Sequence, residues 1–245
     1  MGIYFISDLH LSPERPAITQ AFYHFLSTIA KSAKSLYILG DLFEMWLGDD
    51  DDTPLYREVV QHLKEYNLQG RSSERKTYFM RGNRDFLIGK TFAQSAEVTL
   101  LTDPTVITYQ KQRYLLMHGD SLCTRDHDYM KFRELTRSAD WQKQLLAQPL
   151  DQRRQYANTI RQQSSTMNSL KAADIMDVTQ EAVLQVMEEN LTNTLIHGHT
   201  HRPAKHQLSI HNQPAQRIVL GDWNTQGWYL TIDKNNQRLL ISFDI

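Results

Sequence analysis

The sequence of 245 residues lacks the features of a disulfide-bonded or membrane-spanning chain. It has a single cysteine, Cys123, so no internal disulfide can form, which fits a reducing compartment. No apolar run reaches the roughly 18 residues that suggest a transmembrane helix. The N-terminus lacks the basic start and long apolar stretch of a signal peptide. We therefore expect a cytoplasmic protein in which Cys123 is a small buried apolar side chain.

The sequence also lacks an excess of charge of one sign. Lys and Arg total 27 against 28 Asp and Glu, a formal net charge of −1. Long nucleic acids usually require a basic surface, so we expect no nucleic-acid partner. The apolar fraction of 40% is ordinary for a globular protein. The length allows one large domain with a full core, or a domain that carries an insertion.

Five apolar segments that read as buried strands end in the same way. Each is followed by a polar cluster of Asp, His or Asn, often with glycine beside it. Ligand sites in open α/β sheets lie outside the carboxyl ends of the strands, and glycine lets the backbone approach a ligand closely. Distant parts of the sequence can therefore converge on one site. The five segments are 3–7, 36–39, 77–80, 114–117 and 194–196.

Apolar periodicity predicts the remaining elements. The strand pattern vanishes between 124 and 178, which we interpret as a helical insertion. Basic side chains outnumber acidic ones there, so we expect it to face an anion or an anionic surface, with a solvated helical face as the alternative. The acidic run 49–52 reads as a solvated turn. The predicted helices are 19–30, 55–66, 129–138, 151–164 and 169–175, and the further strands are 106–109, 218–220 and 239–242.

The strand-end clusters contain side chains with the chemistry of metal ligands. Asp41 offers a carboxylate that could bridge two ions, and the other clusters add carboxylate, amide and imidazole groups. Two metals about 3.5–4 Å apart can clamp both oxygens of an in-line displacement at phosphorus and acidify a water. Ligands without thiolate favour Mn, Mg, Fe or Zn. We therefore predict a two-metal phosphoesterase. Its seven predicted ligands are Asp8, His10, Asp41, Asn83, His118, His199 and His201.

In their order along the chain, these clusters resemble those of the calcineurin-like metallophosphoesterases. The matching words are Asp8-x-His10, Gly40-Asp41, Gly82-Asn83, His118-Gly119 and Gly198-His199-Thr200-His201. The resemblance implies an α/β fold, a β-sandwich flanked by helices with the dinuclear site at its top. The longer stretches 37–44, 82–87, 117–124 and 196–203 look like the UDP-2,3-diacylglucosamine pyrophosphohydrolase family.

This narrower resemblance implies an activity in lipid A biosynthesis. Water would attack the α-phosphorus of UDP-2,3-diacylglucosamine and release UMP and 2,3-diacylglucosamine 1-phosphate (lipid X). The family implies two Mn²⁺ ions per chain and a catalytic role for Asp41, Asn83 and Arg84. One implied ion site is Asp8, His10, Asp41 and His201, and the other is Asp41, Asn83, His118 and His199.

Substrate contacts are also implied by the resemblance. Arg84 stands where many relatives in the superfamily have a proton-donating His, and as a permanent cation it would neutralise pyrophosphate charge. Its alternative is a surface ion pair with Asp85. The implied substrate-binding residues are Asn83, Arg84, Asp126, Ser164, Asn168, Lys171 and His199. For Asp126 and the three residues of the insertion, the alternative is a polar helix surface.

The resemblance further suggests a division of the chain. Residues 1–124 and 178–245 would form the metallophosphoesterase core, and 125–177 a helical lid. Candidates for an acyl-chain groove are Trp46, Leu47, Phe86, Leu87 and Ile175, with core packing as the alternative. The insertion is polar, so contact with anionic lipid on the cytoplasmic face of the inner membrane would rest on basic residues at ~1 kcal/mol each. We expect a monomer.

Two rival functions remain open at this point. Another metallophosphoesterase, acting on dinucleoside polyphosphates, cyclic nucleotides or DNA, would share the ligands but lack the Ser164, Asn168 and Lys171 pattern. A non-enzymatic binding module on the same fold should have lost several ligands, and all seven are present in the sequence.

Overall fold

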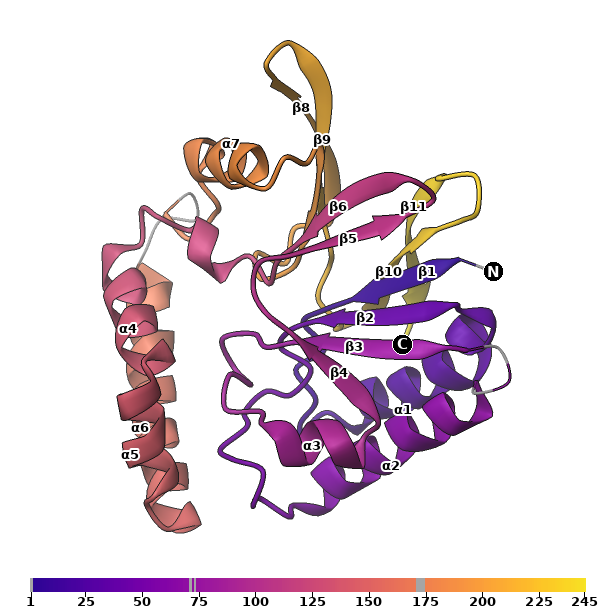
Figure 1. Ribbon diagram of the computed structural model, residues 1–245. Coiled ribbons are helices and arrows are strands. Elements are labelled where there is room, and N and C mark those ends of the chain that lie inside the picture. The colour runs from indigo at the N-terminus through magenta and orange to yellow at the C-terminus, as the bar shows by residue number, and fades with distance from the viewer. Residues whose placement is uncertain (1, 71, 73, 171–174) are drawn as a thin grey trace.

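The computed structural model describes residues 2–70, 72, 74–170 and 175–245, with 162–170 described by their backbone alone. Two β-sheets pack against each other and are flanked by helices (Figure 1). Within the described residues, the first sheet has six strands in the order β11-β10-β1-β2-β3-β4 and the second has five in the order β5-β6-β7-β9-β8. The predicted α/β sandwich is confirmed.

The strands of the first sheet are β1 (Ile3–Ile6), β2 (Ser35–Leu39), β3 (Lys76–Met80), β4 (Val98–Leu101), β10 (Gln226–Ile232) and β11 (Arg238–Asp244). Those of the second are β5 (Thr105–Tyr109), β6 (Gln112–Leu116), β7 (Thr194–His197), β8 (Ala204–Ile210) and β9 (Gln213–Val219). The α-helices are α1 (Pro16–His24), α2 (Pro54–Gln69), α3 (Lys90–Ser95), α4 (His127–Arg137), α5 (Ala139–Leu146), α6 (Leu150–Leu170) and α7 (Gln180–Glu189). A π-helical segment, Phe25–Ile29, continues α1.

Parallel pairing brings the strand ends to one edge. β1 pairs with β2, and β2 with β3, in parallel, with Ile6 opposite Ile38 and Leu39 opposite Met80. In the second sheet β6 and β7 are also parallel. Because carboxyl ends of parallel strands meet at one edge, the loops that follow these five strands can gather there.

The core lies between the two sheets and beneath the helices. Phe5 and Leu39 from the first sheet are fully buried against Leu116 and Ile196 from the second. Each such side chain contributes about 1.5–3 kcal/mol when it leaves water. On the outer face of the first sheet, α1 and α2 cover a second apolar cluster, and α7 packs on the second sheet (Figure 1). The edge that gathers the strand ends therefore lies on a fully packed core.

Helices α4, α5 and α6 form the insertion, which stands at one side of the sandwich (Figure 1, left). Its two roots lie together, since the Cys123 thiol donates to the Met176 carbonyl at 3.4 Å and the hydroxyls of Thr124 and Thr179 are 2.7 Å apart. The predicted helix 151–164 extends as α6 to Leu170. The predicted helix 169–175 falls mostly outside the described residues. The lid boundaries 125–177 remain a prediction.

The acidic run is the clearest correction to the sequence interpretation. Asp49 accepts the backbone N–H groups of Gly89 and Phe92, and Asp51 is buried. Asp50 pairs with Arg153 on α6. Three of the four carboxylates therefore anchor this turn to parts of the chain far away in sequence, and Asp52 is exposed to solvent.

Several predicted details also change. The structure adds β4, β8, β10, α3, α5 and α7 to the predicted elements. Trp46 packs against Phe43 and Tyr56 in the core, and Leu47 and Leu87 are 5% exposed, so core packing holds for these three acyl-groove candidates. Of the helices in the described ranges, none is both long and apolar enough to cross a membrane.

Candidate metal centre

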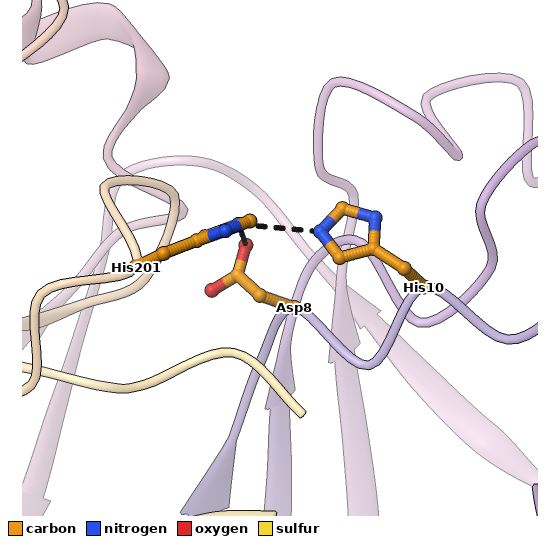
Figure 2. Close-up of side chains that lie close together, drawn as sticks. All are labelled: Asp8, His10 and His201. Carbon is orange, nitrogen blue, oxygen red and sulfur yellow. Dashed lines mark hydrogen bonds and ion pairs between the residues drawn. The ribbon is translucent and has the colours of Figure 1, made fainter. Parts of the chain in front are cut away.

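Contacts link all seven predicted ligand side chains at one edge of the sandwich, which we call the rim. His10 Nε2 lies 3.2 Å from His201 Nε2, which in turn lies 3.5 Å from a carboxylate oxygen of Asp8 (Figure 2). Asp41 lies 3.9 Å from His10 and 3.7 Å from His118, so it stands between the two halves of the rim.

The amide of Asn83 joins the other half of the rim. Its Oδ1 atom lies 2.8 Å from His118 Nε2 and 2.9 Å from His199 Nδ1. The same group thus contacts two imidazoles from the loops that follow β6 and β7 of the second sheet. The amide oxygen and both ring nitrogens are ligands that divalent ions accept.

Unusual backbone conformation aims these side chains. Five rim residues have φ between 50° and 67°, in the left-handed region that residues other than glycine seldom adopt. Such conformations cost of order 1–3 kcal/mol each and persist only where the surroundings enforce them. Hydrogen bonds from Asp8 N to Gly40 O, from His10 N to Asp41 O and from His199 N to Asp8 Oδ2 hold three of these residues in place. The five are Asp8, His10, Asp41, His199 and His201.

Two glycines are required by close approach. A Cβ atom at Gly82 would overlap the Asp41 carboxylate, and one at Gly198 would overlap that of Asp8. The loops before Asn83 and His199 can therefore lie directly against the acidic groups. This explains physically why both ligand clusters contain glycine at these positions.

Burial and charge act together on the titration of the rim. Burial alone would raise the pKa of Asp8, but the nearby His201 imidazole and the charges of His118 and His10 hold that pKa well below its usual range. Burial would lower the pKa of His118, but Asp41 and Asp120 outweigh it and raise it to about 9. These carboxylates make the rim attractive to cations.

The donor set fits divalent metal ions. Two groups have ligand atoms within 4.8 Å of one another, Asp8 with His10 and His201, and Asp8 with Asp41 and His118. Within the described residues, the buried Oδ1 atom of Asp8 has no hydrogen-bond partner. A buried carboxylate oxygen without a donor is costly, and a cation would satisfy it. Asp8 belongs to both groups, so either it or Asp41 could be shared.

Arg84 stands beside the rim. Its backbone N–H donates to Asp41 Oδ1 at 2.8 Å, and its guanidinium lies 3.9 Å from Glu44. Asp85, the partner considered in the sequence, instead accepts the backbone N–H groups of Leu42 and Gly82. Arg84 therefore places a cation that is 36% exposed beside Glu44, next to the rim.

The structure describes the predicted substrate residues of the insertion to different extents. Asp126 caps α4, where its side chain accepts the N–H of Tyr129 at 3.1 Å. Ser164 and Asn168 belong to α6, in the part described by backbone alone, and Lys171 lies outside the described residues. Asp126 therefore has a structural role as the N-cap of α4.

Sequence reasoning missed the residues that tie the insertion to the rim. Asp120, two residues after His118, is buried and accepts hydrogen bonds from Tyr129 at 2.7 Å and Arg133 at 2.9 Å. Arg137 donates to the Gly82 carbonyl at 2.9 Å, next to Asn83. Asp120 lies within the stretch 117–124, but no local sequence pattern indicates that its partners lie on a helix later in the chain.

The comparisons with known proteins agree with this geometry. The model of the calcineurin-like phosphoesterases matches residues 1–203. A protein of Cellvibrio japonicus called UDP-2,3-diacylglucosamine hydrolase is 53% identical over 94% of each chain. Proteins with the same name from Pseudomonas aeruginosa and Chromohalobacter salexigens are 51% and 50% identical, over 97% and 99% of this chain and 98% of each of theirs.

Proposed function

This chain belongs to the calcineurin-like phosphoesterases and, within them, to the family of the UDP-2,3-diacylglucosamine hydrolases, and we propose that it hydrolyses the pyrophosphate bond of UDP-2,3-diacylglucosamine. Water attacks the α-phosphorus, and the products are UMP and 2,3-diacylglucosamine 1-phosphate. The observation that carries the proposal is the convergence at one rim of seven oxygen and nitrogen donors from five strand ends.

Two Mn²⁺ ions would bind among the seven rim side chains. Bound divalent ions supply positive charge that acidifies the attacking water and offsets charge on the phosphoryl oxygens. Asp41, which lies between His10 and His118, would hold both halves of the rim together. Asn83 and His199 would contact the ions and the substrate at the same edge.

Arg84 would provide a fixed cation for the pyrophosphate. Its guanidinium stays charged at any physiological pH, so it cannot act as a proton donor to the leaving oxygen. It would instead stabilise the charge that develops on the phosphoryl group. Its position beside Asp41 supports this role.

The insertion would close over the lipid-linked sugar. We assign Ser164, Asn168 and Lys171 to substrate binding on the family pattern, and Asp126 to the same region. Contacts of α4 with the loop before Asn83 support a lid close to the rim. We further propose a monomer without a nucleic-acid partner, in peripheral contact with anionic lipid on the cytoplasmic face of the inner membrane.

A turnover assay tests the proposal. UDP-2,3-diacylglucosamine is compared with a dinucleoside polyphosphate, a cyclic nucleotide and a DNA substrate, each with Mn²⁺ and with a chelator. We expect Mn²⁺-dependent release of UMP from the first substrate alone. Preferred turnover of any other substrate would assign the chain a different phosphoesterase activity.

The site of attack needs a separate measurement. Hydrolysis in ¹⁸O-labelled water should place the label in UMP, because the bond forms at the α-phosphorus. Label in the sugar phosphate would instead show attack at the other phosphorus.

A further inference from the structure

A carboxylate beside the rim has contacts that the ligand set does not explain. The Glu44 side chain is 17% exposed, and its Oε2 atom lies 3.2 Å from His10 Nδ1. Its Oε1 atom lies 3.0 Å from the guanidinium of Arg161 on α6 and 3.9 Å from that of Arg84. One carboxylate therefore touches a predicted metal ligand, a predicted substrate-binding cation and the insertion.

We propose that Glu44 is a positioning residue that orients His10 for metal binding and holds Arg84 and Arg161 at the rim. Only the part of this inference that concerns the substrate, at the two arginines, rests on the proposed function. Imidazole ligands usually donate their second ring N–H to a carboxylate, a carbonyl or water, which fixes the ring and raises its basicity. His118 follows this rule, since its Nδ1–H donates to the Leu39 carbonyl at 2.9 Å.

At His10 the Glu44 carboxylate occupies the corresponding place, with Oε2 3.2 Å from Nδ1, and Nδ1 has no hydrogen-bond partner among the described residues. With Nδ1 against Glu44, the Nε2 atom is directed toward His201 and Asp41, at 3.2 and 3.9 Å. A carboxylate at this distance favours the tautomer with its proton on Nδ1, whose Nε2 lone pair faces the rim. Its loss would release the ring.

The Oε1 atom of Glu44 contacts the two arginines. Arg161 is 54% exposed and is carried by the insertion, so the pair with Glu44 fixes where its charge lies. The Glu44 carboxylate lies within ion-pair distance of both guanidinium groups, 3.0 Å from that of Arg161 and 3.9 Å from that of Arg84. It therefore keeps both cations near the place where pyrophosphate would bind.

Two substitutions separate the two roles. Glu44→Gln keeps an oxygen that can accept from His10 but loses the charge that attracts the arginines. Glu44→Ala removes both. We expect Mn²⁺ affinity, measured by the electron paramagnetic resonance signal of free Mn²⁺, to fall about 10-fold to 100-fold in Glu44→Ala and less than about 3-fold in Glu44→Gln.

Steady-state kinetics give the second readout, on whichever phosphoester the wild type turns over. Both variants should raise KM, and Arg161→Met should raise KM without changing Mn²⁺ affinity. Glu58→Gln, an exposed glutamate on α2, is the matched control and should change neither quantity.

The outcomes are decisive. Wild-type Mn²⁺ affinity in Glu44→Ala overturns the role at His10, and wild-type KM in Glu44→Gln overturns the role at the arginines. If circular dichroism shows that Glu44→Ala does not fold, Glu44→Leu, which keeps most of the side-chain volume but accepts no hydrogen bond, takes its place in the Mn²⁺ measurement. Mn²⁺ affinity needs no substrate, so a wrong substrate assignment would leave that test intact.

Discussion

The rim and the insertion are held in place by different kinds of contact. At the rim, left-handed backbone conformations and main-chain hydrogen bonds aim the side chains. The insertion is held by arginine side chains that reach carboxylates of the core. These arginines are Arg133, Arg137, Arg153, Arg154 and Arg161, and their partners are Asp120, Asp50, Asp51 and Glu44.

The difference separates two kinds of sensitivity. A rim residue takes part in a conformation that its neighbours enforce, so one change disturbs several ligands at once. An arginine pair can be removed one at a time, and the remaining pairs still hold the helices. Experiments on the two regions should therefore give effects of different size and reach.

The largest effect should come from Asp41→Ala. Asp41 stands between His10 and His118, so its removal would separate the two halves of the rim. We expect turnover to fall by on the order of 10³-fold or more, measured as kcat with saturating Mn²⁺. Asp52→Ala, an exposed residue of the acidic run, is the control and should keep wild-type activity. Near wild-type turnover in Asp41→Ala would remove the rim from the chemistry.

The next effect should come from Asp120→Ala, where the two regions meet. The substitution leaves Tyr129 and Arg133 without their buried acceptor. Removal of one partner from a buried charge pair costs about 3 kcal/mol, which urea denaturation would measure. Glu134→Gln on the exposed face of α4 should change stability by less than about 0.5 kcal/mol. Equal stability of both variants would mean that Asp120 does not anchor α4.

A smaller and more local effect should come from Arg153→Met. Arg153 is 2% exposed and donates to the Leu47 carbonyl and to Asp50. We expect a loss of about 1–3 kcal/mol and faster hydrogen exchange over residues 150–161, with Mn²⁺ affinity unchanged. Arg154 is 41% exposed, and its partner Asp51 also accepts hydrogen bonds from Thr53, so Arg154→Met should cost less than about 1 kcal/mol. Weaker Mn²⁺ binding in Arg153→Met would contradict the separation of the two regions.

The smallest effect concerns the roots of the insertion. Cys123 is buried, as the sequence predicts, and burial raises its pKa to about 12. Its thiol therefore stays protonated at pH 8 and should not react with a thiol reagent such as dithionitrobenzoate in the native protein. One equivalent should react after unfolding in guanidinium. Rapid reaction of the native protein would show that the contact between Cys123 and Met176 opens easily.

The sequence was most informative where a local pattern determines structure. An apolar run followed by Asp, His or Asn predicts both a strand and the position of its end, and the five strand ends do meet. β8 was missed because its Lys205, His206 and Gln207 lack an apolar run, and pairing with β9 determines its conformation. The partners of Asp50 and Asp120 could not be predicted, because they depend on how helices pack across long separations in sequence.

The close approach of Thr124 and Thr179 has a consequence for how such a chain can change over time. The chain leaves the core at Thr124 and returns to it at Thr179, so both connections of the insertion lie at one place. Loop-closure entropy grows only slowly with length, by about 0.6 kcal/mol for each doubling. A lineage could therefore lengthen, shorten or exchange this module to suit a new lipid while the catalytic framework keeps its shape.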